Sequence, residues 1–136
     1  GHIFFNDDWY GFDDAIYSAL RIIEVLSKNK LKPHEVFNSY PKHFSTPEIN
    51  LKVPEEVKFK IIDELKTLII SSGYVLIDID GIRLESENSW GLVRASNTSP
   101  NLVLRFEGKT ESDLLEIKNY FKEILSKIEF DLQLDF

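Results

Sequence analysis

The sequence predicts an α+β fold in which helices cover one face of an antiparallel sheet. Three observations indicate this fold. Four short β-like segments follow one another over residues 74–107, and in the last of them Leu102, Leu104 and Phe106 alternate with Val103, Arg105 and Glu107. One amphipathic helix precedes this run, over residues 54–69, and another follows it, over residues 110–128. Since two-faced helices bury their apolar stripe on a sheet, we expect the order β-α-β-β-β-β-α after an N-terminal helical segment.

The N-terminal segment, residues 1–45, predicts a helix and a linker. Asp13 and Asp14 place acidic groups at the positive end of a helix dipole. The apolar face of this helix consists of Ile16, Leu20, Ile23 and Leu26. Prolines then interrupt the chain, with a short helix expected around residues 34–39. We therefore place a domain boundary at residue 46.

Residues 46–136 predict the sheet domain. A strand over residues 50–53 leads to Pro54, a favourable first residue of a helix that Gly73 would end. The stripe of this helix consists of Val57, Ile61, Leu65, Leu68 and Ile69. The four expected strands are Tyr74–Asp78, Ile82–Glu87, Trp90–Ala95 and Leu102–Glu107.

The connections between these elements also carry recognisable signals. Asp80 and Gly81 form the dipeptide of a two-residue hairpin between the first two strands. Thr110 and Asp113 have the spacing of a capping box at the start of the last helix. That helix is expected to bury Leu114, Ile117, Phe121, Ile124 and Ile128.

Composition excludes several classes of protein. The net charge is -7, which argues against a nucleic-acid partner, because neutralising phosphates takes many clustered Lys and Arg. No apolar run approaches the length that spans a bilayer, so we expect no membrane partner. The chain has no cysteine, which excludes disulfides and is consistent with a cytoplasmic location. It also has no methionine, which indicates that it was processed or cut from a longer protein.

One loop concentrates the groups that bind an anion. Ser96, Asn97 and Thr98 offer hydroxyl, amide and backbone N–H donors, and Arg94 and Arg105 flank them with forked cationic donors. Short loops of this composition most often only turn the chain. On composition alone a polar turn is therefore the favoured interpretation, and the local excess of cations keeps a phosphate site open as the alternative.

These residues also carry a resemblance. The run Gly91–Pro100, followed by Leu102–Glu107, resembles the C-terminal phosphate-binding loop of the phosphomannomutase/phosphoglucomutase group of the α-D-phosphohexomutase family. Three further segments match in order, so the resemblance covers essentially the whole chain. They are Asp14–Arg21, Ser45–Ile49 and Asp80–Arg83.

The resemblance implies a division of the chain and a function. Residues 1–45 would be the end of the family's third domain, an α/β domain, plus a linker. Residues 46–136 would be its fourth domain, whose fold is TATA-box-binding-protein-like. The family interconverts hexose 1-phosphate and hexose 6-phosphate, using a phosphoserine and Mg²⁺ that belong to its other domains. The implied partners are therefore a sugar phosphate and the remaining domains of a parent enzyme.

The resemblance also implies roles for individual residues. Arg94, Ser96, Asn97, Thr98 and Arg105 would bind the phosphate that does not react. The chain would hold no metal ligand and would not catalyse the reaction alone.

His2 is the one catalytic candidate. Gly1 and His2 resemble the end of the family's sugar-binding loop, which implies an active-site role for His2. A cloning remnant is the alternative origin of these two residues. Two other functions also stay open: a stand-alone module that binds phosphate or an acidic ligand, and a structural interaction domain.

Overall fold

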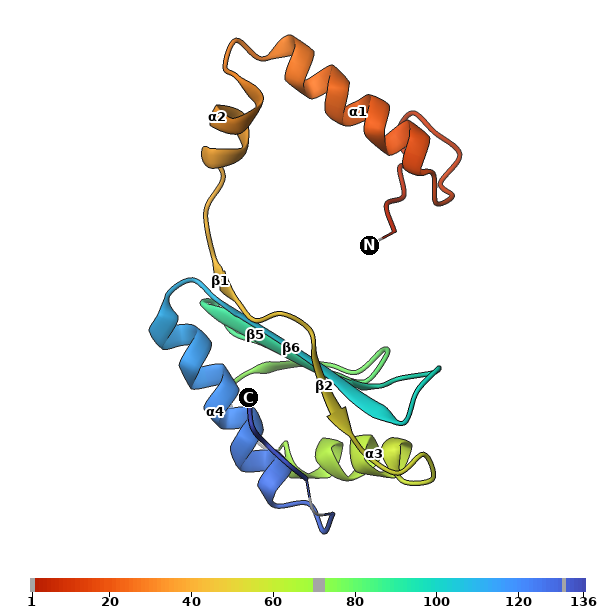
Figure 1. Cartoon of the computed structure of the whole chain (residues 1–136), viewed down its shortest axis with the longest axis vertical. Helices are drawn as coiled ribbons and strands as arrows, with labels where there is room; N and C mark the ends of the chain where they lie inside the picture. The colour runs from red at the N-terminus through yellow and green to blue at the C-terminus, as the bar shows by residue number, and fades with distance from the viewer. Residues whose placement is uncertain (1, 70–72, 131) are drawn as a thin grey trace. The chain divides into compact units, whose positions relative to one another are not determined.

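The computed structural model describes residues 2–69, 73–130 and 132–136, which form two compact units (Figure 1). The N-terminal unit runs to Pro41, and the C-terminal unit begins at Lys42. The division falls a few residues before the boundary placed at residue 46, because Phe44–Ser45 already pairs with a strand of the C-terminal unit.

The N-terminal unit contains the helices α1 (Ala15–Lys28) and α2 (Pro33–Asn38). Asp14 caps α1, since its Oδ1 accepts a hydrogen bond from the backbone N–H of Tyr17 at 2.9 Å. The short helix expected after α1 is confirmed as α2. Aromatic rings pack beside α1, and the ring of Trp9 stacks on that of Tyr17 with centroids 4.3 Å apart.

The apolar stripe of α1 is largely exposed within its own unit. Ile16, Leu20 and Ile23 are 76%, 58% and 60% exposed. The expectation of an amphipathic helix is confirmed, but the stripe has no core to join among residues 2–41.

The described residues of the C-terminal unit form one antiparallel sheet, with strands in the order β1-β6-β5-β4-β3 and with β2 also pairing with β6. The strands are β1 (Phe44–Ser45), β2 (Ile49–Lys52), β3 (Val75–Ile77), β4 (Ile82–Glu85), β5 (Ser89–Ala95) and β6 (Asn101–Gly108). The expected meander of four strands is confirmed as β3 to β6. The strand β1 was not expected, because two residues are too few to show a period.

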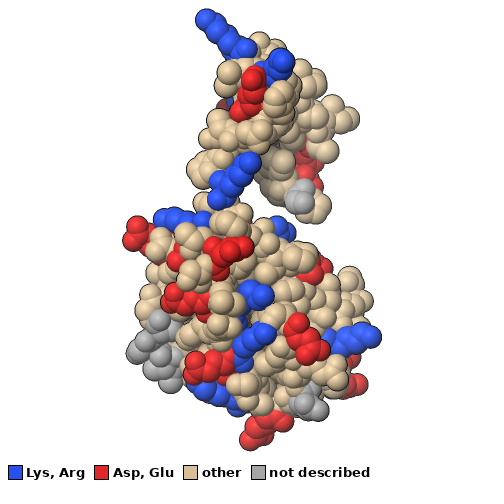
Figure 2. Space-filling view, turned by 60° about the vertical axis from the view of Figure 1, so that its left-hand side comes forward, with Lys and Arg blue, Asp and Glu red and all other residues tan. Residues whose placement is uncertain are grey.

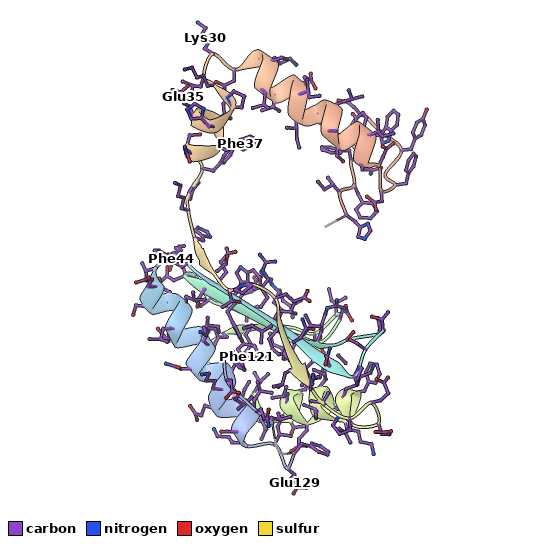
Figure 3. The ribbon with its side chains drawn as sticks, viewed as in Figure 1. Lys30, Glu35, Phe37, Phe44, Phe121 and Glu129 are labelled. Carbon is purple, nitrogen blue, oxygen red and sulfur yellow. The ribbon has the colours of Figure 1, made fainter. Side chains whose placement is uncertain are left out.

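Helices α3 (Lys58–Leu68) and α4 (Glu111–Ser126) cover the same face of the sheet (Figure 1). This covered face is apolar, since alternate residues of β6 turn toward the helices and are fully buried. Phe121 projects from α4 toward the strands (Figure 3), and its ring lies 5.3 Å from that of Phe106. Gly91 leaves room for this contact, because a Cβ there would lie 2.5 Å from the Phe121 ring.

Two boundaries differ from the sequence expectation. α3 begins at Lys58 rather than Pro54, because the residues after Pro54 first form a turn closed by Val57 N–H donating to Pro54 O at 3.2 Å. The β3–β4 turn spans residues 78–81 rather than two residues, with Gly81 at a φ of +99°. α3 ends at Leu68, and the following segment up to Gly73 includes residues outside the described ones.

The start of α4 is confirmed as a capping box. Thr110 Oγ1 accepts from the backbone N–H of Asp113 at 3.2 Å, and the Asp113 carboxylate accepts from the backbone N–H of Thr110 at 3.0 Å. The chain as described contains no helix that combines the length and the apolar character needed to cross a membrane.

Candidate functional site

The five residues predicted to bind phosphate lie on one hairpin. Arg94 ends β5, Arg105 lies in β6, and the connecting loop carries the polar residues between them. Arg94 pairs with Val103, and Arg105 pairs with Leu92, so the two arginines occupy diagonal positions on the same face of the sheet. This face is opposite to the one that the helices cover, and long side chains at diagonal positions are within reach of each other.

Ser96 shapes the loop from inside. Its backbone N–H donates to Asn101 O at 2.9 Å, which continues the pairing of the two strands. Its hydroxyl oxygen accepts from Ser99 Oγ at 2.8 Å and from the Thr98 backbone N–H at 3.4 Å. Ser96 is only 7% exposed, so these hydrogen bonds lie inside the loop and connect its residues to each other. The Ser96 hydroxyl accepts in both bonds, which leaves its own hydrogen available to donate.

The outer side of the loop presents unused donors. Asn97 and Thr98 are exposed. Among the described residues, neither the backbone N–H nor the side chain of Asn97 has a hydrogen-bond partner. Thr98 holds its N–H only in the long contact to Ser96, so both residues can turn donors toward a ligand.

The two arginines differ in their surroundings. Arg94 Nη1 lies 3.5 Å from a carboxylate oxygen of Asp80, in the β3–β4 turn. That turn passes close to Arg94, because a Cβ on Gly81 would lie 2.8 Å from the Arg94 Cα. Arg105 is exposed and has no ion pair or hydrogen bond with any described residue. Arg105 is therefore the freer of the two guanidinium groups.

A residue that the sequence reading missed supports the loop from behind. Lys58, the first residue of α3, is 1% exposed, and its Nζ donates to Ser96 O at 2.6 Å and to Ser99 O at 3.3 Å. It also pairs with Glu55 Oε1 at 2.6 Å. One signal could have revealed it: Lys58 falls on the apolar face of α3, one helical turn before Ile62.

Several other charged residues of the exposed sheet face pair with each other, whereas Lys52, which is exposed and pairs with Asn101 in the register of β2 and β6, has no ion pair among the described residues. Arg83 lies over the Trp90 ring at 3.9 Å and donates to Glu85 at 2.6 Å. His43 contacts Glu107 at 2.8 Å. Figure 2 shows basic and acidic side chains interspersed on the view that it presents of the larger unit, without a broad basic area. Among the described residues of this face, the unpaired donors therefore lie at the β5–β6 hairpin and at Lys52.

His2 lies in the N-terminal unit and is exposed. It donates a hydrogen bond through Nδ1 to the Asp13 carboxylate, and this bond holds the pKa of Asp13 below its usual value. The backbone N–H of Ile3 also donates to Asp13, at 3.3 Å. Asp13 thus accepts hydrogen bonds from His2 and Ile3 beside α1, while Asp14 caps the helix.

Metal ligands do not gather in the part of the chain that the structure describes. No group of three or more His, Cys, Asp or Glu residues is placed to hold an ion there. Asp7 and Asp8 instead face Arg21, with contacts of 3.8 Å and 3.7 Å.

Comparison with known proteins shows which family this chain resembles. Residues 48–124 match the family model described as "Phosphoglucomutase/phosphomannomutase, C-terminal domain". A phosphomannomutase/phosphoglucomutase of Pseudomonas putida is 49% identical over 136 residues, which is 100% of this chain and 29% of the relative. A phosphoglucomutase of Neisseria meningitidis serogroup A is 45% identical over 127 residues, or 92% of this chain and 27% of the relative.

A solved structure agrees with these sequences. It is a phosphoglucomutase/phosphomannomutase family protein from Burkholderia thailandensis, with a TM-score of 0.81 and 38% identity over 97% of this chain and 28% of that protein. The chain therefore spans less than a third of the length of the relatives that it matches.

Proposed function

Because the chain belongs to the phosphoglucomutase/phosphomannomutase family and matches its C-terminal domain, we propose that the β5–β6 loop binds a phosphate group of a hexose phosphate. The observation that carries this proposal is the set of unpaired donors on the outer side of the loop, flanked by two arginines on one face. The residues that bind the phosphate would be Arg94, Ser96, Asn97, Thr98 and Arg105.

The donors suit a phosphate dianion. Two guanidinium forks supply charge-assisted hydrogen bonds, and the Asn97 N–H adds a donor of fixed direction. No carboxylate of the loop itself faces this set, and Asp80 is its one acidic neighbour among the ion pairs of the described residues. A site built in this way recognises the phosphate firmly and the sugar ring loosely.

Loose recognition of the ring is what a hexose phosphate mutase needs. We propose that the parent enzyme interconverts hexose 1-phosphate and hexose 6-phosphate, and that this loop holds the phosphate that does not react in either orientation of the sugar. The phosphoserine and Mg²⁺ of the family would then be supplied by other domains. Among the described residues of this chain, no group of three or more His, Cys, Asp or Glu residues is placed to hold the metal ion.

His2 remains a proposed active-site residue of the parent enzyme. Two observations support this role: Gly1 and His2 resemble the end of the family's sugar-binding loop, and the ring of His2 is exposed. We also propose a cytoplasmic location, from the absence of cysteine in the sequence.

The test is an ¹⁵N-NMR titration of this chain with glucose 1-phosphate, mannose 1-phosphate and inorganic phosphate. We expect shifts centred on the amides of residues 94–99, of similar size for all three ligands. Arg94→Ala and Arg105→Ala should each weaken binding about tenfold or more, because each removes charge-assisted hydrogen bonds. The purified chain should show no mutase turnover.

Arg83→Ala is the matched control, since Arg83 lies on the same sheet face but already contacts Trp90 and Glu85. It should leave the phosphate affinity unchanged. Equal losses in all three arginine variants would mean diffuse charge attraction instead of a site. The absence of shifts at tens of millimolar ligand, about ten-thousandfold above a micromolar dissociation constant, would overturn binding by this loop alone.

A further inference from the structure

The buried ammonium of Lys58 is the least expected feature of the C-terminal unit. Its side chain is 1% exposed, although an unpaired buried charge is strongly unfavourable. Its three N–H groups meet three acceptors, namely Ser96 O at 2.6 Å, Ser99 O at 3.3 Å and Glu55 Oε1 at 2.6 Å. All the donors of Lys58 are therefore satisfied, and two of them end on the loop proposed to bind phosphate.

These bonds orient the backbone of the loop. In a trans peptide the C=O of one residue and the N–H of the next point in opposite directions. Because Ser96 O points toward Lys58, the N–H of Asn97 points away from it, to the side where it has no partner among the described residues. A cation on the carbonyl also polarises the peptide and strengthens that N–H as a donor.

A second contact binds a carbonyl at the other end of the loop. The carbonyl of Pro100 accepts from the backbone N–H of Val53 at 3.0 Å. The carbonyls of Ser96 and Ser99 thus accept from the first residue of α3, and the carbonyl of Pro100 accepts from the residue after β2. An anion approaching the outer side would therefore meet donors and not these carbonyl oxygens.

We propose that Lys58 is a positioning residue that sets the loop in its anion-binding conformation by holding the carbonyls of Ser96 and Ser99. Its effect is on geometry, because Glu55 offsets its charge. Lys58 does not touch the ligand. The ligand named here rests on the proposed function, whereas the shape of the loop can be measured without any ligand.

The first test uses the unmodified chain without ligand. NMR should detect a scalar coupling across the hydrogen bond from Lys58 Nζ to the Ser96 carbonyl carbon. Absence of this coupling, together with rapid exchange of the Lys58 ammonium hydrogens with water, would overturn the proposal. This measurement needs no variant and so does not depend on how a variant folds.

The second test compares Lys58→Met with Lys60→Met. Lys60 is exposed on the same helix, so its replacement should leave the loop unchanged. Lys58→Met should shift the Asn97 amide signal, increase the mobility of residues 96–99 and weaken inorganic phosphate binding about tenfold or more, as the loss of preorganisation and of aligned donors predicts. Unchanged α4 signals would show that the sheet domain remains folded, and Glu55→Gln serves as the milder variant if they change.

The outcomes separate the two proposals. If Lys58→Met alters the loop but the unmodified chain binds no phosphate, the positioning role stands and the proposed function fails. If the unmodified chain binds phosphate and Lys58→Met binds it equally, with the Asn97 signal unmoved, the positioning role is overturned and the proposed function stands.

Discussion

At the residue scale, the chemistry of the loop depends on which groups are already occupied. The carbonyl of Ser96 accepts a hydrogen bond from Lys58, and the Asn97 N–H on the opposite side has no partner among the described residues. Arg105 likewise has no partner among them, whereas Arg94 Nη1 lies 3.5 Å from an Asp80 carboxylate oxygen. An exposed pair at this distance contributes little to stability.

We therefore expect Asp80→Asn to strengthen phosphate binding. Removing one negative charge next to Arg94 should tighten the dissociation constant for inorganic phosphate about two- to fivefold, with the gain shrinking at high salt. Asp78→Asn is the matched control, because Asp78 lies in the same turn but faces Lys66 at 3.6 Å. Weaker binding in Asp80→Asn would show instead that Asp80 orients Arg94.

At the element scale, α4 provides the main cover of the sheet. It packs Phe121 against β6 and against Gly91 of β5. At the start of α4 the side chains of Thr110 and Asp113 each accept a hydrogen bond from the backbone N–H of the other residue. Two of the N–H groups that have no partner within the helix are therefore satisfied. The stability of the sheet domain should accordingly respond to this cap.

Thr110→Ala should lower the free energy of unfolding of the C-terminal unit by about 1 kcal/mol, the usual cost of losing a side-chain cap. Trp90 fluorescence during urea unfolding reports on this unit, provided that Trp9 is replaced by Phe to remove the signal of the other unit. Ser112→Ala is the control, because Ser112 is exposed in the same turn and its side chain has no hydrogen bond with any described residue. Equal losses in both variants would contradict a specific cap.

At the scale of the whole molecule, the two units differ in how well they bury their apolar residues. The C-terminal unit has a continuous core beneath the sheet, including Leu102, Leu104 and Phe106 at 0% exposure. The N-terminal unit instead exposes the stripe of α1. Contiguous apolar surface of this kind marks a face that associates with another surface.

We expect this chain to self-associate through the N-terminal unit. Sedimentation velocity should show mass increasing with concentration, and the double change Leu20→Lys with Ile23→Lys should restore a monomer. Ile79→Lys is the control, since Ile79 is 93% exposed but isolated in the β3–β4 turn. A monomer at every concentration, or an equal effect of the control, would contradict the prediction.

Much of the fold could be predicted from local patterns. Alternation of apolar residues predicted β6, and the Thr110–Asp113 spacing predicted the start of α4. Prediction failed where the pattern was short or ambiguous, as at β1, at the turn after Pro54 and at the four-residue span 78–81. The backbone of β1 follows its pairing with β6, and the 78–81 turn passes close to Arg94, whereas the turn after Pro54 is closed locally by Val57 N–H.

The sequence by itself determined the type and order of the main elements, the face that the elements of the C-terminal unit bury and the motif by which the loop resembles a phosphate site. These properties follow from neighbouring residues, whose spacing and side-chain chemistry act locally. Only the tertiary structure decided which donors of the loop are free and which are held. The reason is physical: the burial of Lys58 depends on carbonyl oxygens of Ser96 and Ser99, far along the chain, and only folding brings those acceptors to the ammonium.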